Sequence, residues 1–245
     1  MHPAIRSSRP LVFAHRGGSK IGPENTIAAF DRGLAAGADG LELDVHLSRD
    51  GIAVVHHDAT LDRTTRAKGP LKDRTAAELA ALDVPKLRDV LTRYPGTPII
   101  IELKQRGAAL AGAVVAEVRR AGATDRVCIG SSSVTALRAC RACASDIATS
   151  GARFEVRMAL YRSWCGLPPG RVPYQAFQVP ETSGGTRVVS PRFVQLAHKS
   201  GIAVHVWTVD EPDDIRRLLD WGVDGIISDR PDVAVEVVKD WVSRH

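Results

Sequence analysis

Short apolar runs alternate with longer stretches of helical period along almost the whole chain. The apolar runs predict about eight strands, at residues 11–14, 40–46, 99–103, 126–130, 146–149, 174–179, 203–208 and 225–228. The stretches between them predict helices at residues 26–36, 86–94, 108–121, 134–143, 191–200, 212–221 and 231–242. Prolines at the expected helix starts and glycines at the expected ends support these boundaries.

The alternation of apolar strands with helices is typical of a parallel sheet covered by helices. About eight such units in 245 residues favour a closed (β/α)₈ TIM barrel of the α/β class over an open doubly wound sheet. We expect one domain spanning residues 1–245. The alternation is interrupted once, between the second and third strands, by a segment at residues 47–85 that predicts a small insertion over the barrel mouth.

The second predicted strand carries polar side chains on one face. Since side chains alternate along a strand, Glu42, Asp44 and His46 point into the barrel. On the third strand Glu102 and Lys104 share a face at the carboxyl end, where barrel active sites lie. Carboxylates in a barrel interior are costly unless they are paired or bound to metal. The three carboxylates therefore predict either a site for a hard divalent cation, Mg²⁺ or Ca²⁺, or a structural network of ion pairs.

Two histidines and an arginine are expected at the same mouth. The first strand ends at His15 and Arg16, followed by paired glycines that let the backbone pass close to a ligand. A second histidine, His56 or His57, follows the short apolar run of the insertion. One histidine alone more often has a structural role, but two beside three carboxylates suit displacement at a phosphorus centre. There a cation, Arg16 and Lys104 would neutralise charge while the histidines exchange protons with the attacking and leaving oxygens.

Composition narrows the classes of protein that fit. With 44% hydrophobic residues, 25% charged residues and a net charge of +5 from scattered arginines, the chain lacks the basic stripe of a nucleic-acid-binding protein. No apolar run approaches the about 18 residues of a membrane span, and residues 1–10 show no leader, so we expect a soluble, cytoplasmic protein. The four cysteines are too few for a disulfide framework, and the Cys140–Cys143 pair lacks the further ligands of a zinc site.

A series of short motifs runs in order from about residue 11 to about residue 235. They are His15-Arg16-Gly17, Pro23-Glu24-Asn25-Thr26, Glu42-Leu43-Asp44-Val45, His57-Asp58 followed by Thr60-Leu61-Asp62-Arg63-Thr64-Thr65, Ile101-Glu102-Leu103-Lys104, Trp207-Thr208-Val209 and Ser228-Asp229-Arg230-Pro231. Together they resemble the glycerophosphodiester phosphodiesterase family, and so many collinear motifs make the resemblance specific.

The resemblance implies metal-dependent hydrolysis of small-molecule glycerophosphodiesters to sn-glycerol 3-phosphate and an alcohol. Initial attack by a substrate hydroxyl, giving a cyclic phosphate, is a further hypothesis. The implied roles are acid/base catalysis by His15 and His57, phosphate binding by Arg16, and binding of one divalent cation, Mg²⁺ or Ca²⁺, by Glu42, Asp44 and Glu102 with Lys104 beside them.

Other matching positions have less specific roles. Trp207 is expected either to form an apolar wall for the glycerol carbons or to be a core aromatic. Glu24 and Asn25 are expected to support the first loop and to cap the following helix. Asp229, shortly before Pro231, is interpreted as a residue of a helix start rather than of the site.

The chain also departs from the family pattern. The segment at residues 82–87 passes directly into the third unit where the family has a longer stretch, so the lid over the mouth is expected to be short. This leaves the preferred alcohol open. His56 beside His57 also leaves the second histidine to be tested, although His57 stands in the family position before Asp58.

Three other functions remain. Lysophospholipase D activity would need an apolar channel, which Tyr161, Trp164, Leu167 and Pro168 in the expected loop after the fifth strand could supply. Proton abstraction of the enolase type also uses carboxylates, a cation and a lysine, but the paired histidines and Arg16 count against it. The non-enzymatic alternative is a phosphate-binding barrel without catalysis. Neither the oligomeric state nor the choice between Mg²⁺ and Ca²⁺ follows from the sequence.

Overall fold

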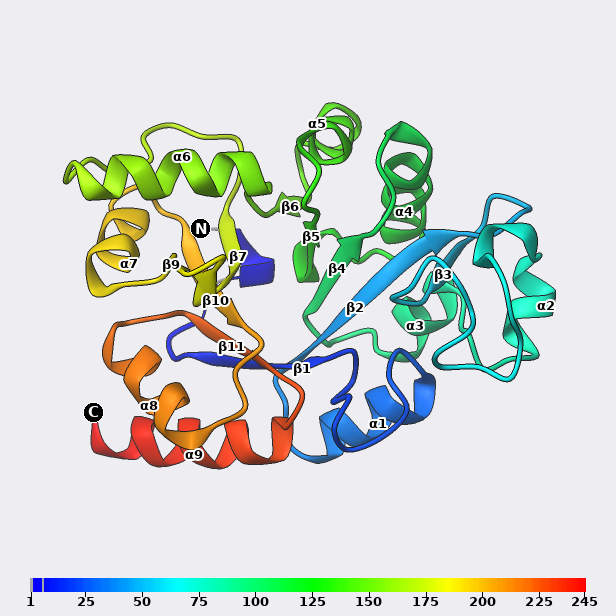
Figure 1. Cartoon of the computed structure of the whole chain (residues 1–245), viewed down its shortest axis with the longest axis horizontal. Helices are drawn as coiled ribbons and strands as arrows, with labels where there is room; N and C mark the ends of the chain where they lie inside the picture. The colour runs from blue at the N-terminus through cyan, green and yellow to red at the C-terminus, as the bar shows by residue number, and fades with distance from the viewer. Residues whose placement is uncertain (1, 6) are drawn as a thin grey trace.

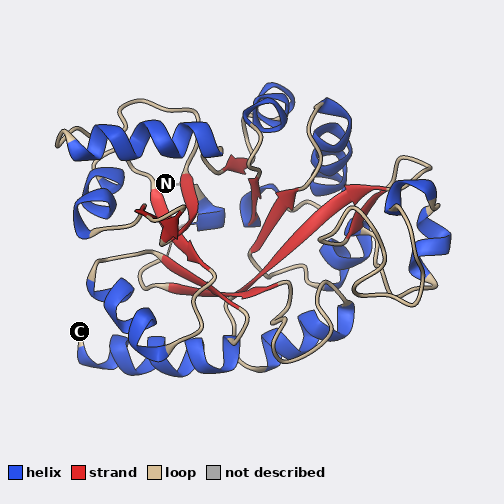
Figure 2. Cartoon of the chain, in the orientation of Figure 1, coloured by secondary structure: helices blue, strands red, loops and turns tan. Residues whose placement is uncertain are grey.

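The computed structural model describes residues 2–5 and 7–245. Met1 and Arg6, which belong to the segment expected to lack a leader, lie outside the described residues. In this described part, eight parallel strands form a nearly closed barrel in the order β6-β5-β4-β2-β1-β11-β10-β7, with helices outside it (Figures 1 and 2). The predicted (β/α)₈ barrel is confirmed.

The barrel strands match the predicted apolar runs closely. They are β1 Leu11–His15, β2 Gly40–Leu47, β4 Ile99–Leu103, β5 Val127–Gly130, β6 Ala148–Thr149, β7 Ala176–Pro180, β10 Ala203–Trp207 and β11 Gly225–Ser228. Neighbouring strands are consecutive around the barrel, as expected for repeated strand–helix units.

The predicted helices are also present. They are α1 Ile27–Ala35, α3 Leu87–Arg93, α4 Ala108–Arg120, α5 Val134–Cys143, α7 Pro191–His198, α8 Pro212–Asp220 and α9 Pro231–Arg244. Short 3₁₀ turns lie at η1 Pro3–Ile5 and η3 Thr124–Arg126. The sequence did not predict α6 Arg153–Trp164, nor the hairpin of β8 Thr182–Ser183 and β9 Thr186–Arg187.

Local side chains fix where several helices begin. Thr26 accepts a hydrogen bond from the backbone N–H of Ala29 at 3.1 Å, which satisfies one of the free donors at the start of α1. Ser190 does the same for Phe193 at the start of α7. Gly17 allows α1 to approach β1, since a Cβ there would meet backbone and side-chain atoms of Ala29 at 2.7 Å.

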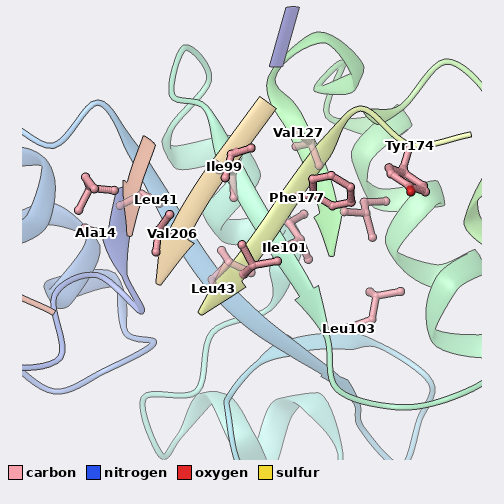
Figure 3. Close-up of a cluster of buried hydrophobic side chains, with 14 of the residues drawn as sticks. Ala14, Leu41, Leu43, Ile99, Ile101, Leu103, Val127, Tyr174, Phe177 and Val206 are labelled. Carbon is pink, nitrogen blue, oxygen red and sulfur yellow. The ribbon is translucent and has the colours of Figure 1, made fainter. Parts of the chain in front are cut away.

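Alternation along the strands separates two apolar layers. Outward-facing side chains such as Leu41, Leu43 and Ile101 pack between the barrel and its helices (Figure 3). Inward-facing alanines and Cys128 form a small-residue cluster at the amino ends of the strands, and Phe13, Ile100 and Ile227 form the next cluster. The carboxyl ends therefore emerge above a filled interior, which leaves the site on a rigid support.

The insertion between β2 and β4 has its own small core. It contains β3 Ala53–Val55, antiparallel to β2, the 3₁₀ turn η2 Leu71–Asp73 and the short helix α2 Ala76–Ala80, and in Figure 1 it extends to one side of the barrel. Its buried side chains are Val54, Leu61, Leu71, Ala76, Leu79 and Val84. Packing of this core holds the loop after β3 near the barrel mouth.

The barrel closes between β6 and β7 through few contacts. A single β-bridge joins Ser150 to Ala176, and the N–H of Gln175 donates to the carbonyl of Thr149 at 3.0 Å.

None of the helices in the described ranges has the length and apolar character needed to cross a membrane.

Candidate active site

A cavity of about 600 Å³ opens at the carboxyl ends of the barrel strands. All the side chains predicted for the site line it: His15, Arg16, Glu42, Asp44, His57, Glu102, Lys104 and Trp207. They come from β1, β2, β4, β10 and the insertion, so the barrel gathers residues that are far apart in the chain. The structure therefore brings together the whole predicted set.

His15 ends β1 and is held by two carboxylates. Its Nδ1 lies 2.6 Å from Oδ1 of Asp229, and its Nε2 lies 3.7 Å from Oε2 of Glu42. Burial acts to lower the pKa of His15, but the negative charge of Glu42 and the hydrogen bond to Asp229 outweigh it, so the pKa is raised above its ordinary value. Nδ1 is engaged by Asp229, which leaves Nε2 on the side of Glu42.

The interpretation of Asp229 as a residue that only starts a helix is wrong. The residue before α9 is Arg230, and it makes no side-chain cap. Asp229 instead directs its carboxylate to His15, and this contact lowers the pKa of Asp229 against the opposing effect of burial. The two residues are 214 positions apart, and no local pattern signals such a contact.

His57 lies just after β3, also beside a carboxylate. Its Nδ1 is 2.6 Å from Oδ1 of Asp58, and Nε of Arg63 donates to the other oxygen of Asp58 at 2.7 Å. The hydrogen bond from Arg63, with a further one from His57, holds the pKa of Asp58 well below its usual range. On the neighbouring strand, Nε2 of His46 lies 3.0 Å from the carbonyl of His57 and so fixes the backbone there.

His56 points away from the cavity. Its side chain is buried, with Nε2 3.1 Å from the carbonyl oxygen of Thr60, and burial lowers its pKa. It therefore stabilises the turn of the insertion, whereas the neighbouring His57 faces the cavity. This geometry agrees with the choice of His57 over His56.

Three carboxylates lie side by side on β2 and β4. Asp44 and Glu102 are partners in the strand register, and Glu42 is two residues before Asp44 on the same face. Burial, followed by repulsion from Asp44, raises the pKa of Glu42 to about 7. Burial also raises the pKa of Glu102 to about 8, although Lys104 opposes this effect. Two of the three carboxylates thus lack sufficient compensating positive charge.

Asp44 differs because it contacts two cations. Nζ of Lys104 lies 2.8 Å from Oδ1 of Asp44, and Nε of Arg16 lies 3.2 Å from Oδ2. These charges overcome burial and lower the pKa of Asp44. The backbone N–H of Arg16 also donates to Glu42 at 3.1 Å, so Arg16 is anchored across the site.

Asn25 supports Asp44 rather than a helix. Its Nδ2 donates to Oδ2 of Asp44 at 2.9 Å, and its Oδ1 accepts from the backbone N–H of Asp44 at 3.3 Å. The expectation that Glu24 and Asn25 cap α1 is wrong, because Thr26 is the cap. Glu24 does support the first loop, since it binds Arg16 at 3.2 Å and Arg63 at 2.6 Å.

Gly130 leaves room for Glu102 at the end of β5. A Cβ at this position would lie 2.7 Å from both Oε2 of Glu102 and Oε1 of Gln178. Gln178, on β7, lines the cavity and donates through Nε2 to the sulfur of Cys128 at 3.5 Å. Neither Gly130 nor Gln178 was predicted. The motif around Glu102 on β4 does not indicate which residues of β5 and β7 lie next to that side chain in the barrel.

The donor set fits a hard divalent cation in its chemistry. Three carboxyl groups supply oxygen ligands, and burial raises the pKa of two of them because their charged forms lack a compensating cation. In the described part of the chain no group of three or more His, Cys, Asp or Glu side chains is arranged to hold a metal ion, and Lys104 and Arg16 lie against Asp44 instead. The predicted cation site therefore stays a prediction.

An apolar wall forms part of the cavity lining, which on α6 also includes Arg153 and Arg157. Trp207 is 41% exposed and lines the cavity, as expected for a wall and not for a core residue. Leu160, Tyr161 and Trp164 also line it. The expectation that Tyr161 and Trp164 belong to a loop is wrong, because both lie on α6.

The chain matches the sequence model of the Glycerophosphoryl diester phosphodiesterase family over residues 15–233. A glycerophosphodiester phosphodiesterase of Caldanaerobacter subterraneus is 31% identical, over 94% of this chain and 98% of that protein. A probable glycerophosphodiester phosphodiesterase of Mycobacterium tuberculosis is 34% identical, over 96% and 92%. A lysophospholipase D of Rattus norvegicus is 29% identical, over 89% and 83%.

Solved structures share the fold. The putative glycerophosphoryl diester phosphodiesterase of Silicibacter pomeroyi superposes with a TM-score of 0.81 at 28% identity, covering 98% of this chain and 96% of that one. A phosphodiesterase of Oleispira antarctica, solved with sn-glycerol-3-phosphate, gives a TM-score of 0.78 at 24% identity, covering 94% and 97%. The barrel fold is thus shared with known structures.

Proposed function

The chain belongs to the glycerophosphoryl diester phosphodiesterase family and is a glycerophosphodiester phosphodiesterase, and we propose that it works by metal-dependent, two-histidine hydrolysis. The products are sn-glycerol 3-phosphate and an alcohol. One observation carries the proposal: two histidines, each bonded through Nδ1 to an aspartate, face the same cavity as Arg16, Lys104 and three carboxylates.

The two histidines move the protons. Asp229 holds His15 and Asp58 holds His57, each at 2.6 Å from Nδ1, so Nε2 of each ring is the atom available to exchange a proton. One histidine accepts a proton from the attacking oxygen while the other donates a proton to the leaving oxygen of the alcohol. The aspartates fix the ring orientation and stabilise the charged imidazolium form.

Positive side chains bind the phosphate. Arg16 and Lys104 line the cavity, where they contact Asp44 at 3.2 Å and 2.8 Å. Their remaining donors are available to the non-bridging oxygens, where negative charge concentrates during displacement. Trp207 packs against the glycerol carbons, because its exposed ring forms part of the apolar wall.

Glu42, Asp44 and Glu102 would hold one divalent cation, Mg²⁺ or Ca²⁺. The cation would stabilise negative charge on the phosphate as a Lewis acid. It would also compensate the charge of Glu42 and Glu102, whose pKa values are raised by burial. Lys104 and Arg16 would then be shared between Asp44 and the phosphate.

The test is release of sn-glycerol 3-phosphate from glycerophosphocholine and glycerophosphoethanolamine. Protein treated with a chelator is assayed alone and after addition of Mg²⁺ or Ca²⁺ separately. We expect no release without metal and restored release with at least one cation, which would also identify the cation. Full activity in the chelated protein would contradict metal dependence. No release under any condition, with cation binding intact, would favour the non-catalytic phosphate-binding barrel.

Lysophospholipase D activity is a second candidate, and the apolar wall favours it. Leu160, Tyr161 and Trp164 add apolar lining from α6, against which an acyl chain attached to the glycerol would lie. Lysophosphatidylcholine tests it, with choline release as the readout. If lysophosphatidylcholine is hydrolysed as fast as glycerophosphocholine, and Trp164→Ala slows only the former, the wall is an acyl-binding surface.

A further inference from the structure

The helix α6 exposes an unusual amount of apolar surface. Of the eight exposed large apolar side chains among the described residues, five lie between residues 154 and 167. Four of them lie on α6 and Leu167 follows its end, and we call the five together the outer face of α6: Phe154, Met158, Tyr161, Trp164 and Leu167. Phe154 and Trp164 are 55% and 56% exposed, whereas Ala159, Leu160 and Ser163 on the other side of the helix are buried.

Three arginines flank this face. At 100° per residue, Arg153 and Arg157 lie on one side of the stripe formed by Phe154, Met158 and Tyr161, and Arg162 lies on the other. All three are exposed, and within residues 2–5 and 7–245 none of them forms an ion pair. The guanidinium of Arg157 lies 5.9 Å from the centre of the Phe154 ring.

The acidic residue of this helix does not offset these charges. Glu155 is bound by Arg141, whose Nη1 lies 2.8 Å from its Oε1. The solvent-facing part of α6 is therefore apolar and positively charged at once. This combination is complementary to a surface that offers hydrocarbon and anionic groups together.

The outer face of α6 continues into the cavity. Tyr161 and Trp164 belong to both, and the flanking Arg153 and Arg157 also line the cavity at its α6 side. Trp207 lies on the cavity wall as another exposed aromatic side chain. In Figure 1, α6 lies along the edge of the molecule beside α7. A flat surface that covered this face would also meet the mouth of the cavity.

A second copy of the chain fits this face poorly. A twofold dimer places the same patch of both copies together, so two sets of three unpaired arginines would meet. A bilayer does not have this difficulty. Trp and Tyr favour the headgroup region, Phe and Met enter the upper hydrocarbon, and arginine binds lipid phosphate.

We propose that the outer face of α6 docks the protein on the surface of a phospholipid bilayer that contains anionic headgroups. The apolar side chains insert between the lipids, Arg153, Arg157 and Arg162 contact the phosphates, and the cavity mouth faces the lipid surface. This goes beyond hydrolysis of a dissolved substrate, and it does not depend on the proposed function, since docking requires no turnover.

The experiment is co-sedimentation of the full chain with vesicles of phosphatidylcholine alone or of phosphatidylcholine mixed with phosphatidylglycerol. We expect binding to the mixed vesicles that weakens as salt is added. The double variant Phe154→Ser/Met158→Ser should bind them on the order of tenfold more weakly. Neither residue lines the cavity, so hydrolysis of glycerophosphocholine should be unchanged.

The matched control is Ile52→Ser/Val242→Ser, which removes two comparably exposed apolar side chains away from α6. It should bind vesicles as the parent does. Trp164 offers a second readout: its fluorescence should shift to shorter wavelength with mixed vesicles, and Trp164→Phe should lose that shift.

Three results would overturn the proposal. The first is absence of binding to either vesicle, and the second is equal binding by the parent and the double variant. The third is a dimer in light scattering that the double variant converts to monomer without any vesicle binding, which would assign the face to a second copy. Equal binding to both vesicle types would overturn the role of the arginines. Vesicle binding is measured without substrate, so failure of the proposed hydrolysis would not affect it.

Discussion

At the scale of single residues, His15 and His57 differ from every other histidine near the cavity. Both line it and both carry an aspartate on Nδ1. We expect His15→Ala and His57→Ala each to lower kcat on the order of 10³-fold, because each removes a proton-transfer group. Release of sn-glycerol 3-phosphate measures the loss, and circular dichroism checks the fold.

The matched control for these variants is His56→Ala. Its imidazole bonds the carbonyl of Thr60 and does not line the cavity, so its rate should stay near that of the parent. A near-normal rate in His57→Ala together with a lost rate in His56→Ala would show that the second histidine was assigned wrongly.

Asp229 is a positioning residue for His15. Asp229→Asn removes one of the two carboxylates that raise the pKa of His15, the other being Glu42, and allows the ring to turn or change tautomer. We expect kcat to fall on the order of 10²-fold with little change in KM. The limb of the pH profile of kcat/KM that belongs to His15 should move to lower pH, which a merely structural role would not cause. The control is Asp232→Asn, three residues further along the chain, which should change neither kcat nor the pH profile.

Residues in short motifs could be predicted from the sequence, whereas long-range partners could not. Glu42, Asp44 and Glu102 were identified because strand alternation aligns them, and His57 because it precedes Asp58 in a motif. The predictions for Asp229 and Asn25 were wrong because the neighbouring sequence suggests a local role for each. Asp229 precedes a helix, and Asn25 stands where a helix cap is expected. Asp229 reaches His15 because the first and last strands of the barrel pair, and Asn25 reaches Asp44 because β1 and β2 are neighbours.

His205 makes folding sensitive to acid. It is fully buried on β10, its two ring nitrogens have no hydrogen-bond partner among the described residues, and burial lowers its pKa to about 4. Between this value and the ordinary pKa of about 6.5, the unfolded chain binds a proton that the folded chain does not, so stability falls as the pH falls.

We therefore expect His205→Leu to reduce the loss of unfolding free energy between pH 7 and pH 5 by about 2 kcal/mol. Urea unfolding of both proteins at the two pH values measures it. An identical pH dependence in the parent and the variant would mean that the imidazole is hydrated or protonated inside the barrel.

At the scale of elements, β5 is shaped to leave space for the site. A Cβ at Gly130 would press on the ends of the Glu102 and Gln178 side chains at 2.7 Å. Because both can rotate away, Gly130→Ala should change stability by less than about 1 kcal/mol. It should nevertheless displace Glu102, so that several times more cation is needed for half-maximal activity.

A titration of activity with Mg²⁺ or Ca²⁺ tests this expectation. Gly112→Ala is the control, since this glycine lies within α4 and a Cβ there would meet no atom within 4 Å. It should leave the titration unchanged and stabilise the helix by about 0.5–1 kcal/mol. An unchanged titration for Gly130→Ala would mean that Glu102 does not bind the cation.

The elements that the sequence predicted are those with a clear period. Helix α6 was missed because polar and apolar residues alternate from Arg153 to Met158, which is the pattern of a strand and not of a helix. Its outer face is apolar although it faces solvent, so the usual contrast between the two sides is absent. The hairpin of β8 and β9 has only two residues in each strand, too few to show any period.

At the scale of the whole molecule, the barrel and the insertion depend on each other for the site. The barrel supplies His15, the carboxylates and Lys104, whereas the insertion supplies His57. The bond between Arg63 and Glu24 joins the insertion to the first loop of the barrel, and the bond between Arg63 and Asp58 fixes Arg63 within the insertion. The repeated strand–helix pattern was enough to predict the barrel, but the relative placement of these two parts follows from such side-chain bonds.

The barrel is expected to open first between β6 and β7. A single bridge, Ser150 to Ala176, joins this pair, whereas β2 and β4 are joined through five register pairs. The side chain of Gln175 compensates in part, because its Oε1 accepts from the N–H of Thr149 at 2.9 Å. Hydrogen exchange followed by mass spectrometry should therefore show faster exchange around Thr149 and Ala176 than along β2.

Gln175→Ala should accelerate this exchange and destabilise the fold by about 1 kcal/mol, since it leaves a buried backbone N–H without its acceptor. Gln195→Ala, on the exposed side of α7, is the matched control and should change neither. Equal protection of the β6–β7 junction and of β2 in the parent would show that the barrel opens as one unit and not first at this junction. The chain passes from β6 directly into α6, which lines the cavity. Faster exchange that extends into residues 153–164 would therefore show that α6 opens together with the β6–β7 junction.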